Sequence, residues 1–254
     1  MELVLEGQRK KLHDLLEETP FLQGRLRVFQ PKQGFRFGID SVLLANFLEV
    51  KPGERALEIG AGTGIISFIA MLRFPHLYPY LFELEPLFIE ALKLGLKANN
   101  FEEKAYVVRG NILKAPFRQG AFDVVYANPP YFKRESGRQS PNPLKNLARR
   151  ESALELKAFL RACEKLLKNR GRLFLVFTAY RLAELIFYCK ELKLEPKVLR
   201  LVHSYPYEEA KICLLKAVKG AKEELRILPP LYIYEGKKKG YTEEVKKYLN
   251  MSYI

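Results

Sequence analysis

The tetrapeptide Asn128-Pro129-Pro130-Tyr131 combines a side-chain amide, two stiff prolines and an aromatic ring. It directly follows the apolar run 122–127, which predicts a buried strand. Proline has no N–H to give to a sheet, so the strand should end at Asn128. The Asn128 amide and the Pro129 carbonyl would then face the crevice where open α/β sheets bind ligands.

Two fixed acceptors beside an aromatic ring suit a planar NH2 group, as in adenine, guanine, cytosine or glutamine. Such a nitrogen is a poor nucleophile because its lone pair is delocalised. Hydrogen bonds from its two N–H groups to Asn128 Oδ1 and the Pro129 carbonyl would favour a pyramidal nitrogen with a localised lone pair, while Tyr131 lies against the flat face of the substrate. The alternative is a Pro-Pro turn that only ends a strand and leaves Tyr131 packed on the surface.

A second motif, Glu58-Ile59-Gly60-Ala61-Gly62-Thr63-Gly64, lies between two apolar segments and predicts a strand, a glycine turn and a helix. Glycines at alternate positions let the backbone pass close to a ligand at a helix N-terminus. A dinucleotide-binding G-x-G-x-x-G would need glycine at position 65 or 67, where this chain has Ile65 and Ser67. The nicotinamide interpretation is therefore weakened, and Glu58 suits a ligand with an amino-acid head group.

About twenty residues later, the apolar run 80–82 is followed by Glu83 and then by Glu85-Pro86. In Rossmann-like folds, a carboxylate at this place accepts hydrogen bonds from both ribose hydroxyls. Glu83 is the better candidate because it directly ends the apolar run. Glu85 precedes a proline and is expected to cap the helix that starts there. For either acid alone, a solvated carboxylate at a helix start is the alternative.

A glycine turn, a ribose acid and a strand-ending Asn-Pro-Pro-Tyr, in this order, resemble class I S-adenosylmethionine-dependent methyltransferases of exocyclic amino groups. Three further segments resemble the bacterial tRNA adenine methyltransferases that modify the adenine 3′ of the valine anticodon. These segments, which carry the more specific part of the resemblance, are 33–45, 228–234 and 240–245. The resemblance extends over nearly the whole chain, from about residue 26 to residue 249.

This resemblance implies an α/β, Rossmann-like fold with a seven-stranded, mostly parallel sheet, a reversed last strand and helices on both faces. It implies S-adenosyl-L-methionine as cofactor and tRNA as partner, with in-line methyl transfer to an adenine amine. The catalytic residues implied are Asn128, Pro129, Pro130 and Tyr131. The cofactor-binding residues implied are Phe37, Asp40, Glu58, Gly60, Ala61, Gly62, Thr63, Gly64, Glu83, Leu84, Asn111, Ile112 and Asn128. Many relatives have an aspartate where this chain has Asn111, so its hydrogen bond to the cofactor adenine would lack charge assistance.

The net charge of +14 favours a polyanionic partner. Six positive side chains and one negative one follow the Asn-Pro-Pro-Tyr motif before the next helical pattern, which suggests a basic flap beside the substrate crevice. We expect five cations to contact substrate RNA: Lys133, Arg134, Arg138, Arg149 and Arg150. The alternative is a solvated loop whose charges only keep the chain soluble. For the three lysines at 237–239, the two interpretations are contact with phosphate and a charged turn tip.

Composition and patterning fit a cytoplasmic enzyme. The 254 residues contain no long apolar run and no signal-peptide pattern, so no membrane association is expected. The three cysteines and three histidines are scattered, which predicts reduced core cysteines and no metal site. The sequence does not fix the oligomeric state, and a monomer is the expectation.

We expect one methyltransferase domain with an N-terminal helical extension over 1–25, a Rossmann-like core over 26–220 and a C-terminal extension over 221–254. Helical patterns occupy 2–18, 41–50, 154–168 and 181–192, the second of them capped by Asp40-Ser41. Strands are expected at 172–178, 197–203 and 211–218. Only seven residues separate the last two strands, too few for a helical crossover, so one of them should be antiparallel.

Three other functions share features with this sequence. A protein-glutamine methyltransferase would use the same Asn-Pro-Pro-Tyr, but too few residues precede Gly60 for the helical substrate domain of those enzymes. A ribosomal-RNA amino methyltransferase would share cofactor, charge and mechanism, and the sequence leaves this alternative open. A non-catalytic RNA-binding protein on a methyltransferase fold is disfavoured by the intact glycine turn, ribose acid and Asn-Pro-Pro-Tyr.

Overall fold

The computed structural model describes residues 11–34, 36–129, 143–236 and 240–250, with the side chains described for all of these except 143–154. Its main strands and helices are β1 Leu16–Phe21, β2 Leu26–Pro31, α2 Ile39–Phe47, β3 Ala56–Ile59, α3 Ile65–Arg73, β4 Tyr80–Glu83, α4 Pro86–Ala98, β5 Tyr106–Arg109, β6 Phe122–Ala127, α5 Pro143–Leu166, β7 Leu167–Thr178, α6 Leu182–Glu191, β8 Leu194–His203, β9 Ala210–Lys219, β10 Arg226–Ile227, β11 Leu231–Tyr232 and α7 Glu243–Asn250. Short 3-10 helices occupy Glu102–Lys104, Ile112–Lys114 and Ala179–Arg181.

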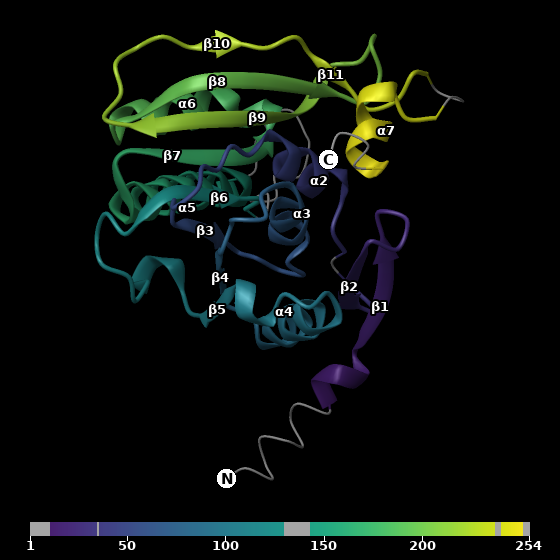
Figure 1. Ribbon diagram of the computed structural model, residues 1–254. Helices are drawn as coiled ribbons and strands as arrows, with labels where there is room; N and C mark the ends of the chain where they lie inside the picture. The colour runs from purple at the N-terminus through teal and green to yellow at the C-terminus, as the bar shows by residue number, and fades with distance from the viewer. Residues whose placement is uncertain (1–10, 35, 130–142, 237–239, 251–254) are drawn as a thin grey trace.

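One large sheet runs through the molecule in the order β5-β4-β3-β6-β7-β9-β8 (Figure 1). All neighbouring pairs are parallel except those of β9, which is antiparallel to both β7 and β8. This confirms the predicted mostly parallel sheet with a reversed last strand. The described residues add two short strands, β10 and β11, which pair in parallel with the outer edge of β8. Both come from the C-terminal segment.

Helices cover both faces of this sheet, and the core is correspondingly divided in two. Along β6, Val124 and Tyr126 contribute to one core, and Val125 and Ala127 to the other. The first core also takes side chains from α2, α3, α4 and α7, whereas the second takes them from α5 and α6. Because side chains alternate along a strand, Asn128 lies on the same face as Tyr126, toward α2.

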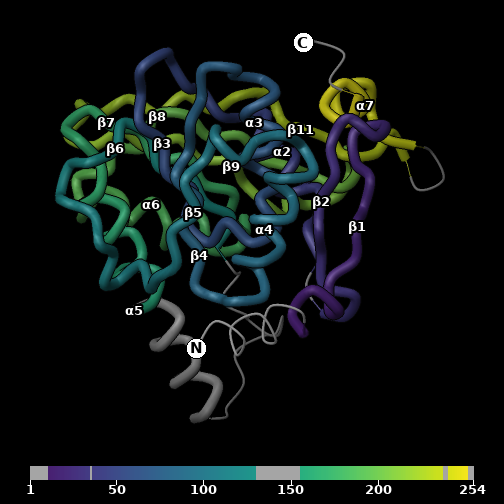
Figure 2. Tube along the Cα trace, turned by 60° about the horizontal axis from the view of Figure 1, so that its bottom comes forward, coloured from purple at the N-terminus to yellow at the C-terminus, as the bar shows by residue number. Residues whose placement is uncertain are grey.

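The N-terminal region differs from the predicted helix over 2–18. Residues 11–14 are helical, but β1 begins at Leu16 and forms an antiparallel hairpin with β2. Gly24, with φ 83°, supplies a left-handed position in the connecting turn. The hairpin runs beside α4 (Figure 2), where Arg27 N donates to Asn99 Oδ1 at 2.9 Å. Pairing of β1 with β2, which itself packs on α4, therefore overrides the local helical pattern.

Two predicted helix boundaries are also wrong. Helix α2 begins at Ile39 with Gly38 as its N-cap residue, and no side chain caps it, so Asp40-Ser41 is not a cap. Helix α5 begins at Pro143, well before the predicted residue 154. Ser41 lies inside α2, and its hydroxyl accepts a hydrogen bond from Asn128 instead of capping the helix. The start of α5 is rich in charged residues and carries little apolar periodicity, so the sequence pattern does not reveal it.

The C-terminal segment packs back onto the sheet through α7. Val245 is fully buried in the first core. Arg200 of β8 binds Glu244 through both carboxylate oxygens, at 2.6 and 2.8 Å. Among the described residues, no helix is long and apolar enough to cross a membrane.

Candidate active site

The glycine turn follows β3 directly and is shaped by left-handed backbone angles. Gly60, Gly62 and Gly64 have φ values of 67°, 54° and 81°, which side chains with a Cβ rarely adopt. A Cβ on Gly64 would lie 2.7 Å from the Phe68 ring, so helix α3 packs closely there. A Cβ on Gly60 would meet no atom within 4 Å, so the backbone at this position faces open space.

Glu83 ends the neighbouring strand β4 and is held by backbone N–H groups. Its Oε2 accepts from Gly62 N at 2.8 Å, and its Oε1 accepts from Leu84 N at 2.7 Å and Glu85 N at 3.0 Å. The carboxylate therefore lies against the glycine turn in a fixed orientation. Glu85 occupies the N-cap position of α4, as expected, although its side chain makes no cap hydrogen bond.

Glu58 lies beneath the glycine turn and not at its surface. Its side chain is 1% exposed and accepts a hydrogen bond from Ser67 Oγ. Ser67 Oγ in turn lies 2.6 Å from the Tyr126 hydroxyl, so the three residues join β3, α3 and β6. Burial raises the pKa of Glu58 to about 8. Its Oε1 has no hydrogen-bond partner among the described residues.

Asn111 follows β5 at the same edge of the sheet and is exposed. Its Oδ1 accepts from Leu113 N at 2.9 Å and so caps the short helix Ile112–Lys114. Backbone bonds tie this end to β4, because Gly110 N donates to the Glu83 carbonyl at 2.9 Å. A carbonyl oxygen has two lone pairs, so Asn111 Oδ1 keeps the capacity to accept one more hydrogen bond.

Asn128 ends β6, and its amide is oriented by helix α2. Asn128 Nδ2 donates to Ser41 Oγ at 3.2 Å, a contact between residues 87 positions apart. Ser41 is 4% exposed, so the bond lies on the inner side of Asn128. With the amide nitrogen engaged in this way, Oδ1 is the group that remains to accept from a ligand. The following Pro129 is buried.

Two further predicted residues lie at the start of α2, one inside the helix and one just before it. Asp40 is in the first turn of α2, one residue before Ser41. The half-buried ring of Phe37 packs edge-to-face on Phe21 of the N-terminal hairpin, with centroids 5.1 Å apart. The strands β3, β4, β5 and β6 are parallel neighbours, so their carboxyl ends lie side by side. At these ends lie, in the same order, the glycine turn, Glu83, Asn111 and Asn128. These ends are where such sheets bind ligands.

Several predicted residues are not tested by this geometry. Pro130, Tyr131, Lys133, Arg134 and Arg138 lie outside the described residues, as does the run 237–239. Arg149 and Arg150 belong to helix α5, but their side chains are not described. Their roles remain predictions.

The sequence interpretation missed Ser41, Ser67 and Tyr126. Ser67 lies in the apolar run 65–72 and Tyr126 in the apolar run 122–127. A lone hydroxyl in a buried element needs a hydrogen-bond partner, so each could have been recognised as half of a buried pair. Nothing in the sequence identifies which partner each residue takes.

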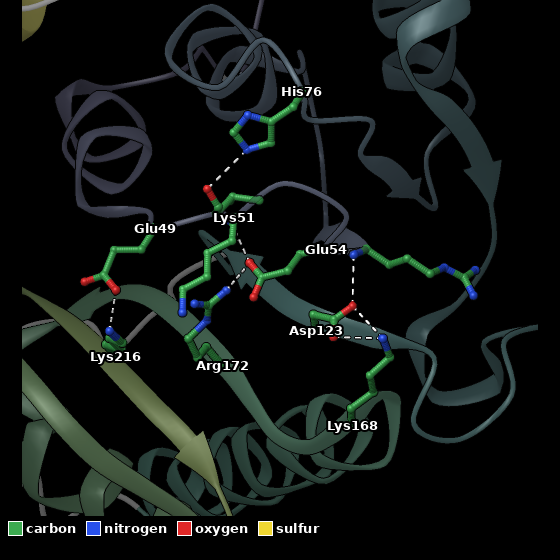
Figure 3. A network of polar contacts seen from close by, with 10 residues as sticks. Glu49, Lys51, Glu54, His76, Asp123, Lys168, Arg172 and Lys216 are labelled. Carbon is green, nitrogen blue, oxygen red and sulfur yellow. Dashed lines mark hydrogen bonds and ion pairs between the residues drawn. The ribbon is translucent and has the colours of Figure 1, made fainter.

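An ion-pair network lies at the other end of the strands, near the starts of β6 and β7 (Figure 3). Lys168 of β7 binds both oxygens of Asp123 at 2.8 and 2.6 Å, and Arg55 N donates to Asp123 Oδ2 at 3.0 Å. Burial raises the pKa of Asp123, but the hydrogen bonds and charges of its neighbours lower it by more, so the net pKa is below its ordinary value. This network connects β6 and β7 at the end away from the glycine turn.

Among the described residues, no group of histidine, cysteine and acidic side chains could hold a metal ion. The three cysteines are buried and free. The glycine turn, the strand-ending acid and the reversed last strand together define a class I S-adenosylmethionine-dependent methyltransferase. The residues fit that cofactor, because open space beside Gly60 and the acceptors Glu83 and Asn111 lie at the ends of three adjacent strands.

Comparison with known families agrees with this class. Residues 35–187 match the family model described as "Methyltransferase small domain", and the chain belongs to this family. Two curated relatives from strains of Porphyromonas gingivalis are named tRNA1(Val) (adenine(37)-N6)-methyltransferase. They are 29% and 30% identical to this chain, covering 74% and 69% of it and 76% and 71% of their own lengths.

Among solved structures, a predicted O-methyltransferase from Agrobacterium tumefaciens has a TM-score of 0.68 at 22% identity. The similarity covers 83% of this chain and 95% of that one. A geranyl diphosphate methyltransferase solved with SAM has a TM-score of 0.51 at 13% identity, over 70% and 84% of the two chains. At these identities the likeness is one of fold.

Proposed function

We propose that the protein methylates the exocyclic amino group of an adenine in tRNA, and specifically adenine 37 of a valine tRNA. The observation that carries the amine chemistry is the orientation of Asn128, whose amide nitrogen is engaged by Ser41 at 3.2 Å. The names of the curated relatives support adenine and tRNA as the substrate class. The net charge of +14 supports a nucleic-acid partner.

The protein contributes chiefly by positioning the amine. Asn128 Oδ1 and the Pro129 carbonyl accept its two N–H groups and direct the nitrogen lone pair away from the ring. S-adenosylmethionine supplies an electrophilic methyl group on a sulfonium, which is already a good leaving group. Holding the nitrogen in line with that group at near-attack distance lowers the entropic part of the barrier. The methylated nitrogen carries a positive charge until it loses a proton, and water suffices to accept that proton.

The cofactor is assigned to the carboxyl ends of β3, β4 and β5. Glu83 accepts hydrogen bonds from the ribose hydroxyls, with its carboxylate held in a fixed orientation beside the glycine turn by three backbone N–H groups. Asn111 accepts from the adenine amine with its second lone pair. The glycine turn lets the backbone approach the remainder of the cofactor.

The deciding experiment supplies tritiated S-adenosylmethionine and total unmodified tRNA, followed by nucleoside analysis of the product. Label in N6-methyladenosine supports the proposal, and purified valine tRNA with adenine 37 replaced should then accept none. Label in methylguanosine would keep the chemistry and change the base. Parallel reactions contain ribosomal RNA or a protein substrate in place of tRNA, and label in one of these with none in tRNA would overturn the tRNA assignment.

Asn128→Ala tests the mechanism in the same assay. We expect methyl transfer to fall by at least roughly a hundred-fold, in line with the loss of a positioned catalytic contact. Cofactor affinity, followed by calorimetric titration, should change far less. Undiminished transfer by this variant would contradict the role given to Asn128.

A further inference from the structure

Four tyrosines from three separate segments form a continuous stack beside the sheet. We call Tyr205, Tyr207, Tyr234 and Tyr241 the tyrosine stack. The centroids of Tyr205 and Tyr207 are 5.9 Å apart with rings 6° from parallel. Tyr205 and Tyr234 are 5.5 Å apart at 33°, and Tyr234 and Tyr241 are 5.2 Å apart at 16°. Nothing in the proposed methyl transfer uses these residues.

Backbone hydrogen bonds hold the stack in place. Tyr234 and Tyr241 face each other across an antiparallel bridge. Tyr234 N donates to the Ser204 carbonyl at 3.0 Å, which ties this bridge to the connection between β8 and β9. That connection turns back on itself, since Glu208 N donates to the Tyr205 carbonyl at 3.1 Å. The rings are therefore arranged before any partner binds.

The two ends of the stack differ in exposure. Tyr241 is half-buried, and burial raises the pKa of its hydroxyl. Tyr207 at the other end is 64% exposed. A largely exposed aromatic ring at the end of a fixed stack is a ready surface for another flat ring.

The register of the sheet places the stack at the same edge as Asn128. Ala127 aligns with Leu175 of β7, then with Leu215 of β9 and Leu199 of β8. Strand β8 continues to His203 and so extends past the level of Asn128 before the stack begins. Three strand spacings and about three residues of strand separate Asn128 from His203, roughly 15–20 Å, and the stack begins two residues after His203. The stack is thus too far away to hold the base that is methylated.

We propose that the tyrosine stack is a docking surface for a second unpaired base of the RNA substrate, which stacks on the outer face of Tyr207. This inference rests on the proposed function. Unpaired bases of RNA loops are recognised mainly by stacking on aromatic side chains. Glu208 pairs with Lys211 at 3.5 Å, and Glu209 adjoins it, so the charges next to Tyr207 do not favour a phosphate and the ring suits the face of a base.

The test compares Tyr207→Ala with Tyr207→Phe, which keeps the ring. We expect Tyr207→Ala to raise the KM for RNA by roughly five- to one-hundred-fold, the range for loss of one base–aromatic stack. Cofactor affinity should stay unchanged, and Tyr207→Phe should resemble the wild type. Tyr78→Ala is the matched control, since Tyr78 is 49% exposed and precedes β4 at the opposite edge of the sheet.

Abasic substitution at each unpaired position of the RNA loop identifies the docked base. One abasic substrate should bind wild type as weakly as intact RNA binds Tyr207→Ala, with no further loss when the two changes are combined. If the wild type methylates RNA and Tyr207→Ala has an unchanged KM, the docking surface is refuted and the proposed function stands. If the wild type neither binds nor methylates RNA, both proposals fail.

Discussion

Asn128 can direct an amine only while its amide points one way, because a reversed amide would present N–H groups to the substrate. The bond from Asn128 Nδ2 to Ser41 Oγ provides this orientation. We expect Ser41→Ala to lower kcat for RNA methylation by roughly five- to ten-fold, equivalent to one hydrogen bond of about 1 kcal/mol. Steady-state kinetics measure this effect.

The control for Ser41 is Ser41→Thr, which keeps the hydroxyl and should retain most of the activity. Cofactor affinity and the thermal midpoint of unfolding should be close to wild type in both variants. An unchanged kcat in Ser41→Ala, with the fold intact, would show that the amide is oriented by other groups.

Glu58 predicts a pH dependence of stability. Its pKa is about 8 in the folded protein and near 4.5 in the unfolded chain, so between these values the folded state holds a proton that the unfolded state has released. Stability should therefore decrease as pH rises from about 4.5 to about 8, by on the order of a few kcal/mol. In Glu58→Gln this decrease should be largely absent. Urea unfolding at pH 5 and at pH 8 gives the free energy of unfolding of wild type and Glu58→Gln. An equal change between the two pH values in both proteins would contradict the raised pKa of Glu58.

At the scale of elements, Glu83 connects the end of β4 to the turn that follows β3. The N–H groups of Leu84 and Glu85 fix the carboxylate, and the N–H group of Gly62 ties it to the turn. We expect Glu83→Ala to weaken cofactor binding by about 1–3 kcal/mol, the range for hydrogen bonds to a charged group. Isothermal titration measures the affinity.

Because Glu83→Ala also leaves the Gly62 N–H without its partner, Glu83→Gln is the better-matched variant. It keeps an acceptor oxygen for the turn and loses the charge. If both variants bound the cofactor as tightly as wild type does, Glu83 would not contact the ribose.

At the scale of the whole molecule, the excess of positive charge predicts salt-sensitive RNA binding. RNA affinity should fall by roughly ten-fold or more between about 50 and 200 mM salt, because each neutralised phosphate releases counterions. Cofactor affinity measured without RNA should change little over this range. Filter binding of tRNA and calorimetry of the cofactor supply the two measurements, and a salt-independent RNA affinity would argue against a phosphate-contacting surface.

The sequence by itself determined the strand that ends at Asn128, the glycine turn and the strand that ends at Glu83. It also determined that one of the last two strands is antiparallel, whereas the family resemblance indicated that the last strand is the reversed one. Each of these depends on local physics: apolar periodicity, the backbone freedom of glycine, the missing N–H of proline, and a connection too short for a crossover. These features were sufficient to predict the fold and the edge of the sheet where ligands bind.

Only the tertiary structure decided which groups meet. It paired Asn128 with Ser41, placed Glu58 under the turn against Ser67, replaced the end of the N-terminal helix by a hairpin, and assembled four tyrosines into one stack. Such contacts join residues far apart in the chain. Their partners are chosen by how helices and strands pack across the sheet, a property that no local pattern of residues contains.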